Sequence, residues 1–88
     1  MICDGITRIL NNSIEMWEKV LVLLYNESPL ERDHLFRVTK HSNKTVFKKI
    51  LENLDAEVLI DYQEDGKCYL SPTGSTEAEN IILRCKNN

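Results

Sequence analysis

Three cysteines and two histidines are the side chains of this chain best suited to metal binding or nucleophilic chemistry: Cys3, Cys68, Cys85, His34 and His41. Structural zinc sites usually draw on ligand pairs spaced about two to four residues apart. No two of the cysteines are close in sequence, and the histidines lie on different predicted elements. The sequence therefore predicts no metal site. An odd number of widely spaced cysteines favours a reduced, cytoplasmic compartment over a disulfide framework.

Sequence motifs of catalytic centres and of membrane segments are also missing. The chain has no glycine-rich phosphate loop, no G-x-S-x-G motif and no paired acid and base. The longest apolar run, Val20 to Tyr25, has six residues, whereas a membrane-spanning helix needs about 20. The N-terminus has no basic start before an apolar block, unlike a signal peptide. We therefore expect a protein that is not an enzyme, needs no cofactor and has no membrane partner.

Charge is the property that points towards a binding surface. The 88 residues carry a net charge of −3, which counts mildly against nucleic-acid binding. From Glu31 to Leu54, however, six Lys or Arg residues and three acidic residues give a local net charge of +3. The other residues, five basic and eleven acidic, give −6. The basic charges thus form one contiguous segment, which is a candidate site for a polyanion.

The elements that would position this segment are mostly helical. Apolar spacing predicts a short helix over residues 1–12, then helices over about 13–26, 30–39 and 44–55. Asn12 and Glu15 fit a capping box for the second of these, and Ser42 or Asn43 fits the cap of the fourth. We expect Trp17 to be buried against the helices that follow it. Inward positions are predicted for Leu35, Phe36, Val38, Phe47, Ile50, Leu51 and Leu54.

A hairpin and a last helix complete the chain. A two-residue turn at Asp65-Gly66 would scatter the apolar residues over both faces of the hairpin. A three-residue loop over residues 64–66 instead gathers Ile60, Tyr62, Cys68 and Leu70 on one face, so we choose that register. Ser71-Pro72 then predicts a capped helix over residues 72–86, because proline fits the first helical position. The whole chain, residues 1–88, is expected to be one α+β domain that is mostly helical.

The order of these elements and several of their residues resemble the winged helix-turn-helix family. The stretch LENLDAEVLIDYQEDGKCYLSPTG is similar to the family pattern of two leucines, a short acidic link, a glycine, Leu-Ile, a hairpin and L-T-P-x-G. The resemblance is closest to small single-domain archaeal or archaeal-virus members and looser to MarR-type regulators. It implies a two-stranded wing with extra N- and C-terminal helices. Val58 replaces the usual glycine, so we expect the link to follow another path, through Ala56-Glu57.

The resemblance also implies that the helix over residues 44–55 enters the major groove of double-stranded DNA. Lysines suit phosphate oxygens, asparagine can read adenine, and threonine can contact a thymine methyl group. The acidic wing tip, Glu64 and Asp65, would repel phosphate. The residues expected to contact DNA are Asn43, Lys44, Thr45, Lys48, Lys49 and Glu52, with Lys67 on the wing.

Two apolar stripes at the ends of the chain lie outside the minimal core that this resemblance implies. They could pack on each other within one chain, but we favour a contribution to a two-fold dimer, since such dimers are the commonest oligomers. The stripes are Ile6, Ile9 and Leu10 at the N-terminus and Ala78, Ile81, Ile82 and Cys85 at the C-terminus. The expected function is a homodimeric, DNA-binding transcriptional regulator with an unknown effector. The alternative is a winged-helix module that binds another protein of a transcription, replication or division complex.

Overall fold

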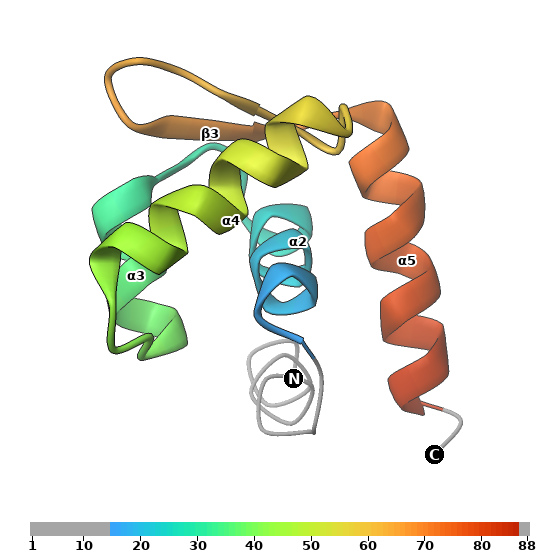
Figure 1. Cartoon of the computed structure of the whole chain (residues 1–88). Coiled ribbons are helices and arrows are strands. Elements are labelled where there is room, and N and C mark those ends of the chain that lie inside the picture. Colours follow the sequence, from blue (N-terminus) through green and yellow to red (C-terminus); the bar gives the residue numbers. More distant parts are fainter. Residues whose placement is uncertain (1–14, 87–88) are drawn as a thin grey trace.

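Residues 15–86 are described by the computed structural model, and they form four helices and a three-stranded antiparallel sheet (Figure 1). The predicted helix over residues 1–12 lies outside the described residues. The fold is α+β and mostly helical, as expected. The elements are α2 (Met16–Asn26), β1 (Leu30–Glu31), α3 (Arg32–Thr39), α4 (Lys44–Ala56), β2 (Ile60–Tyr62), β3 (Lys67–Leu70) and α5 (Pro72–Lys86).

The start of α2 differs from the prediction by three residues. Glu15 is the N-cap itself and forms the capping box with Glu18, so the predicted box with Glu15 in the inner position is wrong. A contact with α5 explains why the helix begins after Glu15. Glu18 is almost fully buried and accepts a hydrogen bond from the Glu15 backbone N–H at 2.9 Å, while its other carboxylate oxygen pairs with Arg84 of α5. The buried carboxylate therefore has partners on both oxygens, which joins the start of α2 to the end of α5.

The sheet has one more strand than predicted. Leu30 and Glu31, expected to begin a helix, instead pair with Cys68 and Lys67 of β3, and the strand order is β1-β3-β2. The two-stranded wing is therefore corrected to a three-stranded sheet, and α3 begins at Arg32. A strand of two residues is too short to show an alternating pattern, so sequence periodicity could not reveal it.

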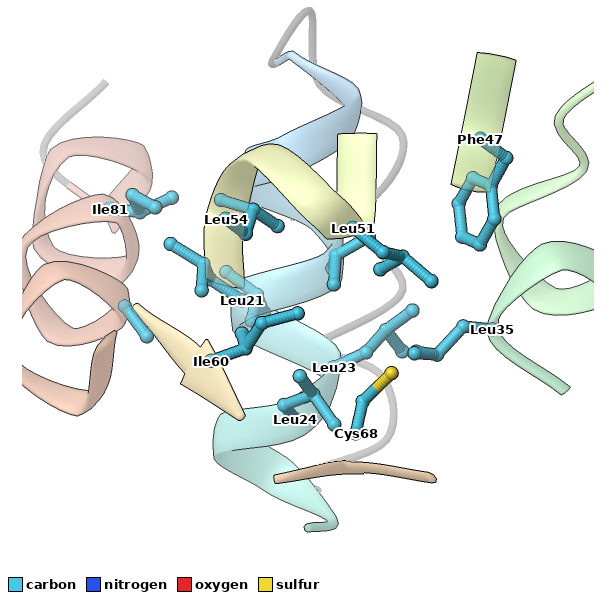
Figure 2. Close-up of a cluster of buried hydrophobic side chains, with 13 residues drawn as sticks. Leu21, Leu23, Leu24, Leu35, Phe47, Leu51, Leu54, Ile60, Cys68 and Ile81 are labelled. Carbon is cyan, nitrogen blue, oxygen red and sulfur yellow. The ribbon is translucent and has the colours of Figure 1, made fainter. Parts of the chain in front are cut away.

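The hydrophobic core lies where α2 meets all the other elements. Figure 2 shows side chains from α2, α3, α4, α5 and both hairpin strands converging in one cluster. Leu35, Phe47, Leu51 and Leu54 are buried as predicted, and Phe36 and Ile50 are half-buried. The fully buried members are Val20, Leu21, Val22, Leu24, Leu35, Leu51, Cys68, Ala78 and Ile81.

Two inward assignments need correction. Val38 is 38% exposed, because Leu35 and Thr39 occupy the buried side of α3. The Thr39 hydroxyl is satisfied there, since it donates to the Leu35 carbonyl oxygen at 2.7 Å. Trp17 is only half-buried and borders an open pocket beside Ile50 of α4, so it is not enclosed by the helices that follow it.

The hairpin has the predicted register. Ile60 pairs with Leu70, and Tyr62 pairs with Cys68. The Gln63 N–H donates to the Lys67 carbonyl oxygen at 2.8 Å, which closes a three-residue loop, and Gly66 has φ +95°. Only glycine adopts that backbone conformation without steric cost. The alternation of apolar residues was therefore enough to choose between the two possible turns.

The link from α4 to β2 does not avoid a positive φ at Val58, so the expected detour through Ala56-Glu57 is wrong. Val58 has φ +61°. Its N–H donates to the Asp55 carbonyl oxygen at 3.0 Å, and the Leu59 N–H donates to the Leu54 carbonyl oxygen at 3.0 Å. These two bonds form a Schellman motif with Val58 at the position usually taken by glycine. The helix therefore ends in the common way, with a residue that is poorly suited to it.

The first turn of α5 crosses the start of β2 in close contact. The Ser71 hydroxyl accepts a hydrogen bond from the Gly74 N–H at 2.9 Å, which confirms Ser71 as the cap. The same hydroxyl lies 2.6 Å from the Val58 carbonyl oxygen and 2.9 Å from the Leu59 carbonyl oxygen, to which it donates. A Cβ atom at Gly74 would lie 1.9 Å from the Leu59 oxygen. The absence of a side chain at Gly74 therefore permits this close approach to the backbone just before β2.

Candidate nucleic-acid interface

The N-terminus of α4 is fixed by the turn that precedes it. The Asn43 side chain accepts a hydrogen bond from the Val46 N–H at 3.1 Å, so Asn43 rather than Ser42 is the cap. The Asn43 N–H donates to His41 Nδ1 at 3.0 Å, and the His41 ring lies 5.7 Å from the Phe47 ring. Reading adenine would need both the amide oxygen and the amide nitrogen of Asn43. The oxygen already accepts the capping bond, so Asn43 has a structural role at the start of α4. Its contact with adenine stays a prediction.

The exposed face of α4 is divided by charge. Lys44, Thr45, Lys48 and Lys49 are exposed in its first half, and Glu52 is exposed in its second half. This order opposes the helix dipole, which favours acidic residues near the N-terminus and basic residues near the C-terminus. No carboxylate of residues 15–86 forms an ion pair with these lysines. The lysines therefore do not stabilise α4 by themselves, and their charge is free to meet an anion.

Two shallow clefts lie along the flanks of α4. The first, of about 350 Å3, lies between α3 and α4 and has Phe36 and Phe47 in its wall. Lys44 lies over the Phe36 ring at 5.8 Å, a cation–π contact that holds this side chain near the cleft. The second, of about 380 Å3, lies between α4 and the hairpin and is lined partly by acidic Glu52, Asp55 and Glu64.

Arg32 is a site residue that the sequence reasoning missed. It lines both clefts, as Lys48 also does. Its guanidinium donates to the Tyr62 hydroxyl at 3.0 Å and lies 3.6 Å from the Asp33 carboxylate, and the hydrogen bond to Tyr62 is the main reason that its pKa is raised. Arg32 belongs to the basic segment seen in the sequence, but only the fold shows that it stands between α3, α4 and the hairpin.

Lys67 is separated from the other expected DNA contacts. It is exposed on β3, where it pairs in register with Glu31 of β1. It lines neither of the two clefts, because β2 is the hairpin strand that faces α4. The grouping of Lys67 with the α4 lysines is therefore not supported by the arrangement of the strands. Glu64 and Asp65 at the hairpin tip are exposed, as expected.

The C-terminal stripe assigned to a dimer interface is largely used within the chain. Ala78 and Ile81 are fully buried, and α5 makes its closest packing against α2 (Figure 1). Their assignment as exposed dimer contacts is therefore corrected: they belong to the core of one chain. Ile82 and Cys85 are half-buried against the same core. Ile6, Ile9 and Leu10 lie outside the described residues.

Other chemistry in the described part of the chain is sparse. Within residues 15–86, no three His, Cys, Asp or Glu side chains are grouped closely enough to hold a metal ion. Burial raises the pKa of the Cys68 thiol to about 12, so this thiol stays protonated and unreactive at neutral pH.

Comparisons with known proteins found no relative of this chain. The chain matched no protein-family model, no curated protein and no solved structure. Among residues 15–86, no helix has the length and apolar character that crossing a membrane requires.

Proposed function

We propose that this protein binds double-stranded DNA through the first half of α4 and acts as a sequence-specific transcriptional regulator of the winged-helix type. The order of the elements supports this proposal. A short turn joins α3 to α4, and the β2–β3 hairpin follows α4 directly and flanks it. In such an arrangement α4 is the helix that enters the major groove.

The observation that carries the proposal is the position of the lysines. Lys44, Lys48 and Lys49 are exposed at the end of α4 where the helix dipole disfavours positive charge. The cost is about 0.3–1 kcal/mol at low ionic strength for Lys44 in the first turn, and it is smaller for Lys48 and Lys49, which lie beyond that turn. A polyanion lying across this end of the helix offsets that cost, because it meets both the dipole and the lysines. Phosphate is the anion that DNA presents in this geometry.

The expected roles of the individual contacts follow from their chemistry. Lys48 and Lys49 bind phosphate oxygens as point charges and set the orientation of α4. Thr45, exposed one turn before Lys49, is the residue for a thymine methyl group. Arg32, whose planar guanidinium is held by Tyr62, adds a positive charge at the junction with the hairpin.

Acidic residues on the second half of α4 and on the hairpin loop limit the area that DNA can contact. Glu52 and Asp55 of α4 and Glu64 and Asp65 of the hairpin loop are all exposed, and they repel phosphate. The DNA therefore lies over the first half of α4 and the α3 side, while the hairpin tip points away from the backbone. The same acidic surface favours the second candidate function, a module that binds a basic surface of another protein.

A homodimer in the cytoplasm is also part of the proposal. Ala78 and Ile81 no longer support it, since they are buried within the chain. Leu83 is the exposed apolar residue of α5, at 57% exposure. A dimer that uses Leu83 would give paired half-sites on DNA.

Selection of duplexes from a random pool, followed by anisotropy titrations of the selected and scrambled sequences, tests the proposal. We expect binding to both at low salt and tighter binding to the selected duplex. The logarithm of the binding constant should fall against the logarithm of the salt concentration by about 0.9 per phosphate contact. Absence of binding to any duplex at low salt would remove DNA binding and move the protein-interaction function to first place.

A further inference from the structure

A third pocket lies on the opposite flank of α4 from the two clefts described above. Its volume is about 650 Å3, within the range of about 300–1,000 Å3 that is typical of small-molecule sites. The walls come from the start of α2, the second half of α4, the link after α4 at Glu57 and Leu59, and Glu77 of α5.

The inner surface of this pocket is apolar. Met16, Trp17, Ile50 and Leu59 are half-buried there, and Leu54 closes the floor with 2% exposure. Met16, Trp17, Ile50 and Leu59 pack against the core on one side and are exposed to solvent on the other. An apolar ligand of modest size would remove their remaining exposed surface from water, which is the main driving force for binding in such pockets.

The polar side chains around this apolar surface are almost all acidic. Glu15, Glu57 and Glu77 line the pocket together with the amide of Asn53, and none of the described lining residues is basic. The side chains of Glu57 and Glu77 form no ion pair with residues 15–86. A ligand with an apolar body and a positive charge at one end therefore matches the pocket in both respects. An anion of the same shape would keep the apolar contacts but be repelled by the glutamates.

We propose that this pocket binds a small amphipathic organic cation, with its apolar body against Trp17, Ile50 and Leu59 and its cationic group among the glutamates. A quaternary or protonated amine is the fitting class. The face of the Trp17 indole can also contribute a cation–π contact. This inference stands independently of DNA binding, since the pocket shares no lining residue with the two clefts near the α4 lysines.

Titration of the full chain with hexyltrimethylammonium, hexanesulfonate and 1-hexanol, at concentrations below micelle formation, tests the inference. Trp17 is the single tryptophan of the chain, so its emission and its one indole N–H signal in an NMR spectrum report on the pocket without ambiguity. We expect saturable shifts with the ammonium compound, weaker shifts with hexanol and none with the sulfonate. Equal responses to all three compounds would overturn the charge argument, and no response to any would overturn the site.

Two variants that each remove two negative charges separate local from global charge. Glu57→Gln with Glu77→Gln should weaken binding of the ammonium probe by about two- to thirtyfold, because exposed charge pairs contribute about 0.2–1 kcal/mol each. The control, Glu52→Gln with Glu64→Gln, changes exposed carboxylates on the other flank of α4 and should leave binding unchanged. Equal losses in both variants would contradict the proposal. So would a Trp17 signal that changes with protein concentration alone, which would assign the pocket to a second copy of the chain.

Discussion

Replacing Gly74 by alanine should destabilise the protein, although alanine is the better helix former. Gly74 lies in the first turn of α5. In a helix interior without other contacts, Gly→Ala stabilises by about 1 kcal/mol. Here the added Cβ would lie 1.9 Å from the Leu59 carbonyl oxygen, 2.9 Å from its carbon and 2.8 Å from Leu70 Cδ1. The first two atoms belong to the backbone and cannot rotate away, so α5 and β2 must separate.

The magnitude follows from what that separation disturbs. Overpacking a core typically costs about 1–3 kcal/mol. The Leu59 carbonyl also accepts the Ser71 N–H at 3.2 Å and the Ser71 hydroxyl at 2.9 Å, and weakening such bonds costs about 0.5–1.5 kcal/mol each. After subtraction of the helix-propensity gain, we expect a net loss of about 1–5 kcal/mol in the free energy of unfolding. That is a large share of the stability of a small domain.

Urea denaturation followed by circular dichroism measures this loss. Thr76→Ala is the matched control, because Thr76 is an exposed residue of the same helix, and its effect should stay within about 0.5 kcal/mol. A Gly74→Ala variant as stable as the wild type or more stable would show that α5 does not cross the start of β2 this closely.

Three further outcomes are expected. Val58→Gly should stabilise the protein by about 0.5–1.5 kcal/mol in the same assay, because Val58 has φ +61° and is 65% exposed. A loss of stability would contradict the left-handed conformation of this residue. Cys68 should resist iodoacetamide at pH 8 while half-buried Cys85 reacts, as peptide mass spectrometry can show, since burial raises the Cys68 pKa to about 12. The unfolded thiol ionises near pH 8.5, so the stability contributed by neutral Cys68 is kept below about that pH and lost as the pH rises towards 12; equal labelling of both thiols would refute the burial. Leu83→Glu should leave the fold intact and prevent dimerisation in sedimentation experiments, whereas Ile81→Glu should unfold the chain because Ile81 is fully buried; a wild-type monomer at high concentration would remove the dimer.

The parts of the fold that depend on local patterns could be predicted from the sequence. The apolar spacing of Phe47, Leu51 and Leu54 placed the buried face of α4, and the alternation around Ile60 and Cys68 chose the hairpin register. Each of these signals repeats over several residues, so a single exception cannot hide it.

The parts that depend on distant contacts could not be predicted. Strand β1 forms because Leu30 and Glu31 pair with β3. Glu15 is the cap of α2 because Glu18 forms an ion pair with Arg84 of α5. At Val58 the backbone takes a positive φ although the residue is β-branched, and the Ser71 hydroxyl contacts the Val58 and Leu59 carbonyl oxygens from the other end of the hairpin. In the candidate site, the sequence identified the exposed α4 lysines and offered Ser42 or Asn43 as the cap. It could not choose between these two caps or show that Arg32 lines both clefts.

The most direct test of the DNA-binding proposal is the salt dependence of duplex binding by the Lys48→Ala, Lys49→Ala variant. Both lysines are exposed, so thermal stability should stay near that of the wild type. Affinity should fall for all duplexes, and the salt slope should decrease by up to about two, one unit for each lost phosphate contact. The control, Thr76→Glu with Asn80→Glu, changes the net charge by the same amount on exposed positions of α5, away from the first half of α4 (Figure 1). It should keep the wild-type slope. If the lysine variant binds DNA as tightly as the wild type at the same salt concentration, or if the control loses as much, α4 is not the DNA-contacting helix.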